Sequence, residues 1–389
     1  MRINTKLKTI IIIVASPLNE DIIKRIGFHS FKKKMNLIIF DCLPWIRKKV
    51  IPNNLQYLNF DIITIKDYID FKKNIITLKC DFLIDFIGYN KHTRDIQICC
   101  KSNKILFISQ SLYPIPTPIV RSNVFKSLIY SPRATINKIY SLIKRSIFNQ
   151  LPLDPDISLL VGDLSVNHLN INSRHKIFTT SQSWYDIEKE KKLISLKNKC
   201  PKNYILFIDD CISQSIDFVL TDQKSIISPT EYYILLNNFF NKIEQELSMP
   251  VIIAGHPNGK YIDHYANFFN SRNVFFDTTA SLTINADIVL THYSTAINYA
   301  ILSKKSIILM NFDKLQKSYQ GLILQNIAKI LNCKIIEIDK PLKLSKELLI
   351  SPINKTSYKL FIKNYISNEI IINKLGQFEN LINYLLKLK

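Results

Sequence analysis

The sequence predicts an α/β protein with two Rossmann-like domains that face a cleft. Three observations carry this prediction: a length of 389 residues, a series of short uninterrupted apolar runs, and polar helix-compatible segments between them. One hydrophobic core rarely supports a chain of this length, so two domains are expected. Strands buried on both faces of a parallel sheet have continuous apolar sequences. Their alternation with helices is typical of doubly wound sheets.

The first half of the chain contains the strands expected for one such sheet. Five apolar runs precede residue 110, and they read TIIIIVASP, MNLIIFD, FDIITI, CDFLIDFIG and KILFIS. A proline-punctuated region at about 114–155 follows, with the basic helix candidate ATINKIYSLIKRSIFNQ. The one-sided isoleucines of this helix fit either packing on its own domain or contact with anionic lipid. DPDISLLVGD and HKIFTT then predict two more strands, and SWYDIEKEKK predicts a helix.

A second α/β unit begins near Tyr204. Its predicted strands are YILFIDD, PVIIAGHP, NVFFDTT, DIVLTH, KSIILM and CKIIEI, and its helices include SLTINA and STAINYAILS. A long helix is expected from Ser228, because Ser228, Pro229 and Glu231 form a start signal with a capping box. We therefore predict an acceptor domain at 1–200, a donor domain at 201–343, and C-terminal helices at 344–389 that pack back across both domains.

The composition narrows the class of protein. The formal net charge is +21, which favours anionic partners such as phosphorylated substrates, anionic lipid or nucleic acid, or reflects lysines spread over solvated faces. No nucleic-acid motif is recognisable, so nucleic acid is not the expected partner. The N-terminal apolar run is too short for a signal sequence or a spanning helix. We expect a cytoplasmic protein, either free or peripheral on the inner face of the cell membrane.

Two classes of site are disfavoured by the residues that the chain contains. The chain has only seven glycines and neither a G-x-G-x-x-G nor a Walker loop, which argues against dinucleotide enzymes and P-loop NTPases. The seven cysteines lack a C-x-x-C pair, and several lie in apolar runs, as expected for buried free thiols. No metal site and no cofactor are therefore expected.

The strand ends of the second unit carry the candidate chemistry, because ligands of open parallel sheets bind at the carboxyl ends of strands. Asp209 and Asp210 follow one strand, where either carboxylate can act as a base or simply begin a turn. His256 and Pro257 follow another, and a histidine fixed there can donate to a phosphate or protonate a leaving group. Lys260 is close enough in sequence to serve the same anion.

Two further strand ends carry hydroxyl groups. Thr278 and Thr279 precede the predicted helix SLTINA, where they either bind the ribose or base of a nucleotide or cap the helix. Ser294 and Thr295 are expected to open the next helix, which would make an anion site of its free backbone N–H groups. For the acceptor, the sequence offers only basic residues near the proline-rich region: Arg121, Lys126 and Arg133.

These residues together resemble a family. The pattern YILFIDD, VIIAGHP and ADIVLTHYSTAINYAI, over about 204–312, is similar to bacterial GT-B glycosyltransferases that use CMP-activated acidic sugars, such as sialyltransferases and Kdo transferases. The last tract also looks like that of CDP-glycerol glycerophosphotransferases. The resemblance implies that His256 contacts the donor phosphate and protonates the departing CMP. It also implies that Ser294 and Thr295 bind that phosphate, and that Asp209 matches the family's acidic residue.

One motif of the resemblance is missing, which leaves alternatives open. The acidic D/E-D/E-G motif that holds the sialyltransferases' base does not occur as such, because DDC at 209–211 lacks the glycine. The base and the stereochemical outcome stay open. The expected function is metal-independent transfer of an acidic sugar from a CMP donor to a capsule or lipopolysaccharide glycan, either free or lipid-linked. The alternatives are transfer of a polyol phosphate from a CDP donor and a non-catalytic basic protein that binds membrane or nucleic acid.

Overall fold

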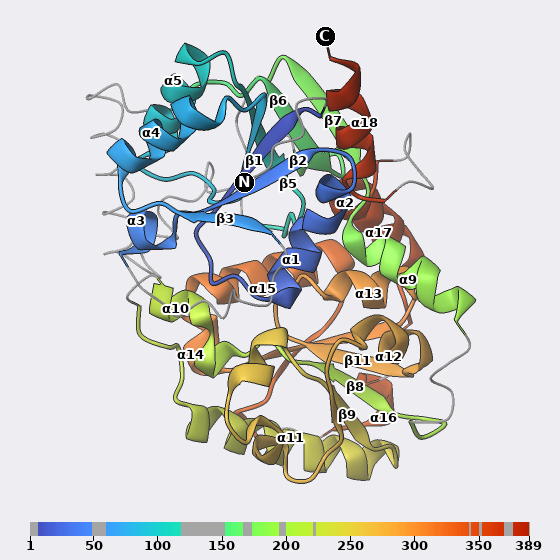
Figure 1. Cartoon of the computed structure of the whole chain (residues 1–389). Helices are drawn as coiled ribbons and strands as arrows, with labels where there is room; N and C mark the ends of the chain where they lie inside the picture. The colour runs from blue at the N-terminus through green and yellow to red at the C-terminus, as the bar shows by residue number, and fades with distance from the viewer. Residues whose placement is uncertain are drawn as a thin grey trace, which may run out of the picture. The chain divides into compact units, whose positions relative to one another are not determined.

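The structure is a computed structural model, and it describes residues 7–48, 60–117, 152–165, 173–193, 200–220, 223–341, 344–349, 352–368 and 376–388. The chain divides into two compact units (Figure 1). Unit 1 comprises Met1–Leu112, Tyr140–Gln182 and Ser367–Lys389, and unit 2 comprises Tyr113–Ile139 and Ser183–Ile366. The predicted domain boundaries at residues 200 and 343 stay predictions.

Unit 1 contains a parallel sheet of seven strands in the order β3-β2-β1-β4-β5-β6-β7. Its first strand, β1, pairs with β2 on one side and with β4 on the other, so that Ile11 lies between Ile38 and Leu83. The central strands are buried along their whole length, as their continuous apolar sequences predict. The strands are β1 (Thr9–Val14), β2 (Asn36–Asp41), β3 (Asp61–Thr64), β4 (Phe82–Asp85), β5 (Leu106–Ser111), β6 (Ile157–Val161) and β7 (His175–Thr179).

Helices cover the sheet of unit 1. One core cluster joins residues of β1, β2 and β4 to Trp45, Phe71, Ile75 and Ile96, so α3, α4 and α5 pack on the same face. Figure 1 shows α4 and α5 next to one another. The described helices are α1 (Glu20–Ile26), α2 (Phe28–Lys32), α3 (Leu43–Arg47), α4 (Tyr68–Leu78), α5 (Thr93–Ser102) and α18 (Glu379–Lys387).

Unit 2 contains a parallel sheet of six strands in the order β10-β9-β8-β11-β12-β13. As in unit 1, the first strand lies third in the sheet and the chain then switches sides, which is the Rossmann arrangement. The predicted fold class, α/β with two Rossmann-like domains, is confirmed. The strands are β8 (Ile205–Ile208), β9 (Val251–Ala254), β10 (Val274–Phe275), β11 (Ile288–Thr291), β12 (Ser306–Asn311) and β13 (Ile335–Glu337).

The long helix of unit 2 begins where the sequence predicts. The Ser228 side chain accepts a hydrogen bond from the backbone N–H of Glu231, and Pro229 is the first helical residue of α11 (Pro229–Leu247). The side chain of Glu231 contacts Lys314 at 2.6 Å. The other helices are α9 (Gln182–Lys192), which begins at the unit boundary, α10 (Ile216–Leu220), α12 (Thr279–Asn285), α13 (Ile297–Leu302), α14 (Asp313–Gln316), α15 (Tyr319–Leu331), α16 (Lys346–Leu349) and α17 (Lys355–Phe361).

Some predicted elements differ from those observed. The strand expected from NVFFDTT is reduced to the two residues of β10. The C-terminal region is divided, since α16, α17 and the π-helical turn Ile362–Ile366 belong to unit 2 and α18 belongs to unit 1. The basic helix candidate at 134–150 and the acceptor candidates Arg121, Lys126 and Arg133 lie outside the described residues. No helix in the described ranges is long and apolar enough to cross a membrane.

Candidate functional site

The candidate residues follow the strands of unit 2 at the carboxyl edge of its sheet. β8 lies between β9 and β11 and pairs in parallel with both. The position between β8 and β11 is therefore the topological switch point, where open α/β sheets bind their ligands. Because all strands run in the same direction, the segments after β9, β8 and β11 leave the sheet side by side. The fold thus brings His256, Asp210 and Ser294 to adjacent strand ends.

Asp210 ties together the two strands at the switch point. Its Oδ2 accepts hydrogen bonds from the backbone N–H of His292 at 3.1 Å and of Tyr293 at 3.2 Å. Burial and the neighbouring Asp209 raise the pKa of Asp210 to about 7, although the Ser294 hydroxyl and the two N–H groups pull it down. A carboxyl group that is partly neutral at pH 7 repels a nearby phosphate less than an ionised one does.

Asp209 points into the protein. Its side chain is 2% exposed, and Oδ2 accepts a hydrogen bond from the hydroxyl of Tyr265. Its Oδ1 is buried and has no partner of normal hydrogen-bond geometry in the described part of the chain. Burial raises the pKa of Asp209 to about 6, offset in part by Tyr265 and by the backbone N–H groups of Cys211 and Asp210. These contacts are those of a structural carboxyl, and a catalytic role for Asp209 stays a prediction.

His256 is held in a fixed turn after β9. A side chain at Gly255 would place its Cβ 2.6 Å from the ring of Phe276, so the glycine allows β9 to end closely against its neighbour. His256 caps the 3₁₀ helix η4 (Pro257–Tyr261), because its Nδ1 accepts a hydrogen bond from the N–H of Asn258 at 3.2 Å. With Nδ1 as acceptor, we assign the proton of the neutral ring to Nε2, which is then a donor.

Lys260 lies in η4 and forms an ion pair with Asp277. Their contact is 2.7 Å long, and the two side chains are 26% and 54% exposed. An ion pair this open to water contributes at most about 1 kcal/mol, so an incoming phosphate can compete for Lys260. Asp277 has a positive φ of 59°, and it brings the turn after β10 towards η4. A phosphate-binding role for Lys260 stays a prediction.

The hydroxyl groups of the two threonines after β10 do not cap α12, which was one of the two roles that the sequence suggested for them. Thr278 is the N-cap residue of α12, but its side chain makes no capping hydrogen bond. Its Oγ1 is buried and has no hydrogen-bond partner in the described part of the chain. Thr279 is the first helical residue, and its carbonyl accepts from the hydroxyl of Thr283 at 2.6 Å. A nucleotide-binding role for Thr278 and Thr279 stays a prediction.

The helix after β11 starts later than the sequence predicts. α13 begins at Ile297 with Ala296 as its N-cap, and not at Ser294. Ser294 closes a turn before the helix, because its Oγ accepts from the N–H of Ala296 at 3.2 Å and its hydroxyl also bonds Asp210. Thr295 is exposed, and its hydroxyl makes no hydrogen bond within the described residues. Ser294 thus supports Asp210, while Thr295 is open to a ligand.

His292 was not a candidate in the sequence analysis, yet it is the central buried polar side chain of this edge. It is fully buried, with Nδ1 at 2.6 Å from the carbonyl of Met310 and Nε2 at 3.1 Å from the hydroxyl of Tyr232. Burial lowers its pKa to about 4, although the Met310 carbonyl has the opposite effect. We infer a neutral ring that donates to Met310 and accepts from Tyr232, and so a structural histidine.

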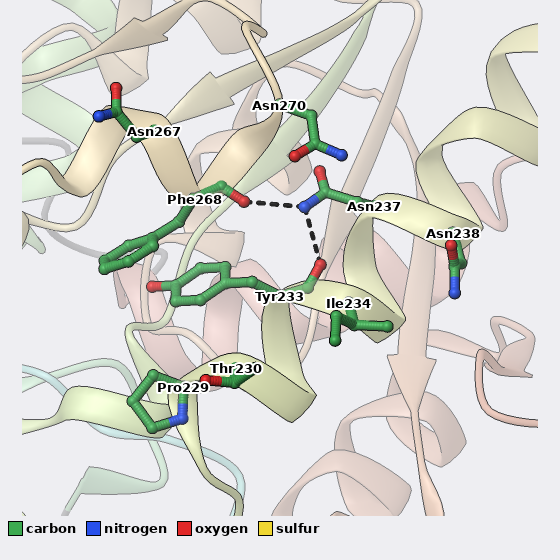
Figure 2. A pocket seen from close by; sticks show the side chains of 9 residues that line it. All are labelled: Pro229, Thr230, Tyr233, Ile234, Asn237, Asn238, Asn267, Phe268 and Asn270. Carbon is green, nitrogen blue, oxygen red and sulfur yellow. Dashed lines mark hydrogen bonds between the residues drawn. The ribbon is translucent and has the colours of Figure 1, made fainter.

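A cavity of about 360 Å³ lies along α11, away from these residues. Figure 2 shows its lining, in which the rings of Tyr233 and Phe268 stack with centroids 4.6 Å apart. The amide of Asn237 donates to the carbonyls of Tyr233 and Phe268, so this side chain is structural. The lining contains no charged side chain and none of the predicted site residues. It is therefore a poor match for a phosphate.

The described part of the chain offers no ligand set for a metal ion. Within the described ranges, no group of three or more His, Cys, Asp and Glu side chains is arranged to hold a metal ion. Near the candidate site the available partners for an anion are the ring of His256, the ammonium group of Lys260, hydroxyls and backbone N–H groups. These groups suit phosphate binding through hydrogen bonds and charge.

Solved structures of glycosyltransferases share this fold. MurG from Acinetobacter baumannii matches with a TM-score of 0.51 at 9% identity, over 98% of this chain and 100% of that chain. The glycotransferase of kitacinnamycin matches with a TM-score of 0.50 at 10% identity, over 91% and 93%. The wall teichoic acid polymerase TagF matches with a TM-score of 0.50 at 14% identity, over 98% and 90%.

These likenesses concern the fold. No family model matches the sequence, and no curated protein matches it significantly. At identities of 9% to 14% the neighbours show that the chain has the GT-B fold of two Rossmann-like domains.

Proposed function

We propose that the chain is a glycosyltransferase that moves an acidic sugar, similar to sialic acid or Kdo, from a CMP-activated donor to a bacterial surface glycan. One observation carries the proposal: His256, Asp210 and the Ser294–Thr295 turn leave three adjacent strands at the switch point of unit 2. Ligands of such sheets bind there. The GT-B fold and the resemblance over 204–312 supply the class of reaction.

His256 is the proposed contact to the donor phosphate. In the reaction, the acceptor hydroxyl attacks the anomeric carbon and gives up its proton to a base. The bond from that carbon to the phosphate oxygen breaks, and CMP leaves with the electron pair. The N–H on Nε2 of the neutral His256 ring would donate a hydrogen bond to the phosphate and stabilise the charge that develops there. Lys260 and Thr295 would add contacts to the same phosphate. We propose no metal or cofactor, since these groups can meet the phosphate charge.

The setting proposed for this reaction is the cytoplasm, with a nucleotide-sugar donor and a glycan acceptor that is free or lipid-linked. The net charge of +21 suits both an anionic acceptor and the inner face of the membrane. Asp210, with its raised pKa, is proposed to position the turn that carries Thr295.

A second candidate is transfer of a polyol phosphate from a CDP-activated donor, which the fold likeness to a wall teichoic acid polymerase favours. In that reaction the attack falls on phosphorus and not on carbon. CMP leaves in both reactions, so CMP binding alone does not separate them. The mass added to the acceptor does, because one reaction adds a sugar acid and the other adds a polyol phosphate.

The first experiment is a thermal-shift series with CMP, CDP, UMP, UDP, GDP and ADP. A ligand that binds only the folded state stabilises it by about 2.7 kcal/mol at one hundred times its Kd. We expect CMP to raise the melting temperature most. Preference for UDP or GDP would contradict the CMP donor, and no response to any nucleotide would contradict the transferase proposal. Donor trials with CMP-sialic acid, CMP-Kdo and CDP-glycerol then decide between the two reactions by product mass.

A further inference from the structure

The outer face of α4 in unit 1 presents isoleucines to solvent. Ile69 is 79% exposed and Ile76 is 53% exposed, and they are seven residues apart on the helix. Lys72 and Lys73 lie between them, so the four residues at i, i+3, i+4 and i+7 share one face. The opposite face buries Phe71 and Ile75 in the core. Core packing therefore explains one apolar face of α4 and leaves the other unexplained.

The neighbouring helix also exposes an isoleucine and a lysine. α4 and α5 are joined by a hydrogen bond from the Tyr68 hydroxyl to the carbonyl of Asp95, and Figure 1 shows them side by side. On α5, Ile98 is 42% exposed, and Lys101 lies three residues further along the same side. We call Ile69, Lys72, Lys73, Ile76, Ile98 and Lys101 the α4–α5 face.

The lysines of the α4–α5 face are not held in ion pairs in the described part of the chain. Lys72, Lys73 and Lys101 make no ion pair within the described residues. The carboxylates of α4 are committed to its first turn: Asp67 accepts from the N–H of Asp70, and Asp70 accepts from the N–H of Lys66 and from Asn74. Asp95 on α5 is the exposed carboxylate closest in sequence to Ile98. Isoleucines and positive charge thus occur on one surface.

We propose that the α4–α5 face docks on an anionic lipid bilayer. Isoleucines that project from a helix surface can enter the boundary between headgroups and acyl chains, while lysines beside them reach the lipid phosphates. Each lysine near an anionic leaflet adds to the attraction. A protein partner fits less well, because lysine is depleted in the centre of protein interfaces. A second copy of the chain would bring lysines against lysines.

The test is co-sedimentation of the full chain with vesicles of phosphatidylcholine alone and of an equimolar mixture with phosphatidylglycerol. We expect binding to the mixed vesicles, which added salt weakens. The double variant Ile69→Asn/Ile76→Asn should lower the partition coefficient about tenfold, because it removes the apolar side chains that would be buried. The control is Ile234→Asn on α11 of unit 2, where the isoleucine is 56% exposed. This control should bind as the wild type does.

A second pair of variants tests the charge. Lys72→Gln/Lys73→Gln should lower binding to mixed vesicles and leave the melting temperature unchanged, whereas Lys189→Gln/Lys192→Gln on α9 should bind as the wild type does. Wild-type protein that ignores mixed vesicles would overturn the proposal. Equal loss in test and control variants would also overturn it, since binding would then lie elsewhere or follow total charge. Sedimentation showing a dimer that only the isoleucine variant loses would assign the face to a second copy.

Discussion

The two sheets have the same strand order at their switch points but different chemistry there. In unit 1, Asp85 is the last residue of β4, and its Oδ1 accepts from the N–H groups of Ile87 and Gly88 in the turn that follows. In unit 2, Asp210 follows β8 and accepts from two N–H groups that belong to the end of β11. The first carboxyl closes a local turn, and the second joins strands that are about eighty residues apart in the sequence.

This difference shows that the same type of sheet can hold a strand-end carboxyl group in two ways. A local turn leaves the strand end independent of its neighbours, while the long-range tie in unit 2 fixes the Tyr293–Thr295 turn against β8. His256 is fixed locally, because its Nδ1 accepts a hydrogen bond from the N–H of Asn258. Polar groups that are fixed at a strand end and still have a free hydrogen-bond donor or acceptor suit ligand binding. This contrast supports the proposal that the nucleotide binds unit 2.

The largest expected effect concerns pH and should be common to both units. Burial raises the pKa of Asp85 and of Asp210 to about 7, from 3.8 in an unfolded chain. The folded state therefore binds more protons between these values, and the stability that these groups contribute is lost as pH rises towards 7. Asp85→Asn and Asp210→Asn should each make the decline less steep, by up to about 1.4 kcal/mol per pH unit.

Urea unfolding at a series of pH values measures this slope. Each unit has one of the two tryptophans, Trp45 in unit 1 and Trp184 in unit 2, so Trp45→Phe and Trp184→Phe backgrounds report on the units separately. We expect each Asn variant to change the slope of its own unit. A variant as pH-dependent as the wild type would show that its carboxyl is ionised in the folded state.

The next expected effect is a loss of stability that differs between the two units. Asp210→Ala leaves the N–H groups of His292 and Tyr293 without their acceptor, and should be about 2 kcal/mol less stable than Asp210→Asn. Asp85→Ala should lose only about 1 kcal/mol against Asp85→Asn, because Gly88 is exposed and water can replace the lost acceptor. Denaturation at pH 5 compares the four variants. Equal losses at the two positions would contradict the distinction between a local and a long-range tie.

A third effect, of similar size, concerns two glycines that follow strands and are required for different reasons. Gly255→Ala should cost about 2 kcal/mol, because its Cβ would lie 2.6 Å from the Phe276 ring. Gly88→Ala should cost about 1 kcal/mol, since Gly88 has a φ of 77° with no atom within 4 Å of an added Cβ. Thermal melting should then show that Gly88→Asn recovers stability and that Phe276→Leu rescues only Gly255→Ala. Rescue of both by one change would contradict these separate causes.

Local sequence signals predicted the frame of the molecule well. The uninterrupted runs at 10–14 and 251–254 are fully buried parallel strands, and Ser228 and Pro229 mark the start of α11. The period of the apolar residues and the capping chemistry act over a few positions, so they can be seen in a single sequence. The positions of Asp210, His256 and Ser294 at one sheet edge follow from the same alternation of strands and helices.

The parts that the sequence did not predict depend on contacts between distant residues. The hydroxyl of Tyr265 turns Asp209 inward, and Tyr232 and the carbonyl of Met310 hold His292. No local pattern marks these partners, so the sequence alone did not distinguish the surroundings of Asp209 from those of Asp210 and did not single out His292. The late start of α13 also depends on a contact between distant residues. The Ser294 hydroxyl bonds Asp210 across the sheet edge, and its Oγ accepts from the N–H of Ala296.

The most direct test of a nucleotide site at the carboxyl edge of unit 2 is a calorimetric titration of CMP into His256→Asn and into its control, His264→Asn. Asparagine can still cap η4, so the first variant removes the imidazole and keeps the turn. His264 is an exposed histidine of the same unit with a φ of 55°, which asparagine tolerates. We expect CMP to bind the wild type and His264→Asn alike. We expect it to bind His256→Asn at least about tenfold more weakly, which corresponds to one lost hydrogen bond to a charged group. Equal CMP affinity in all three proteins, or no CMP binding by the wild type, would contradict it.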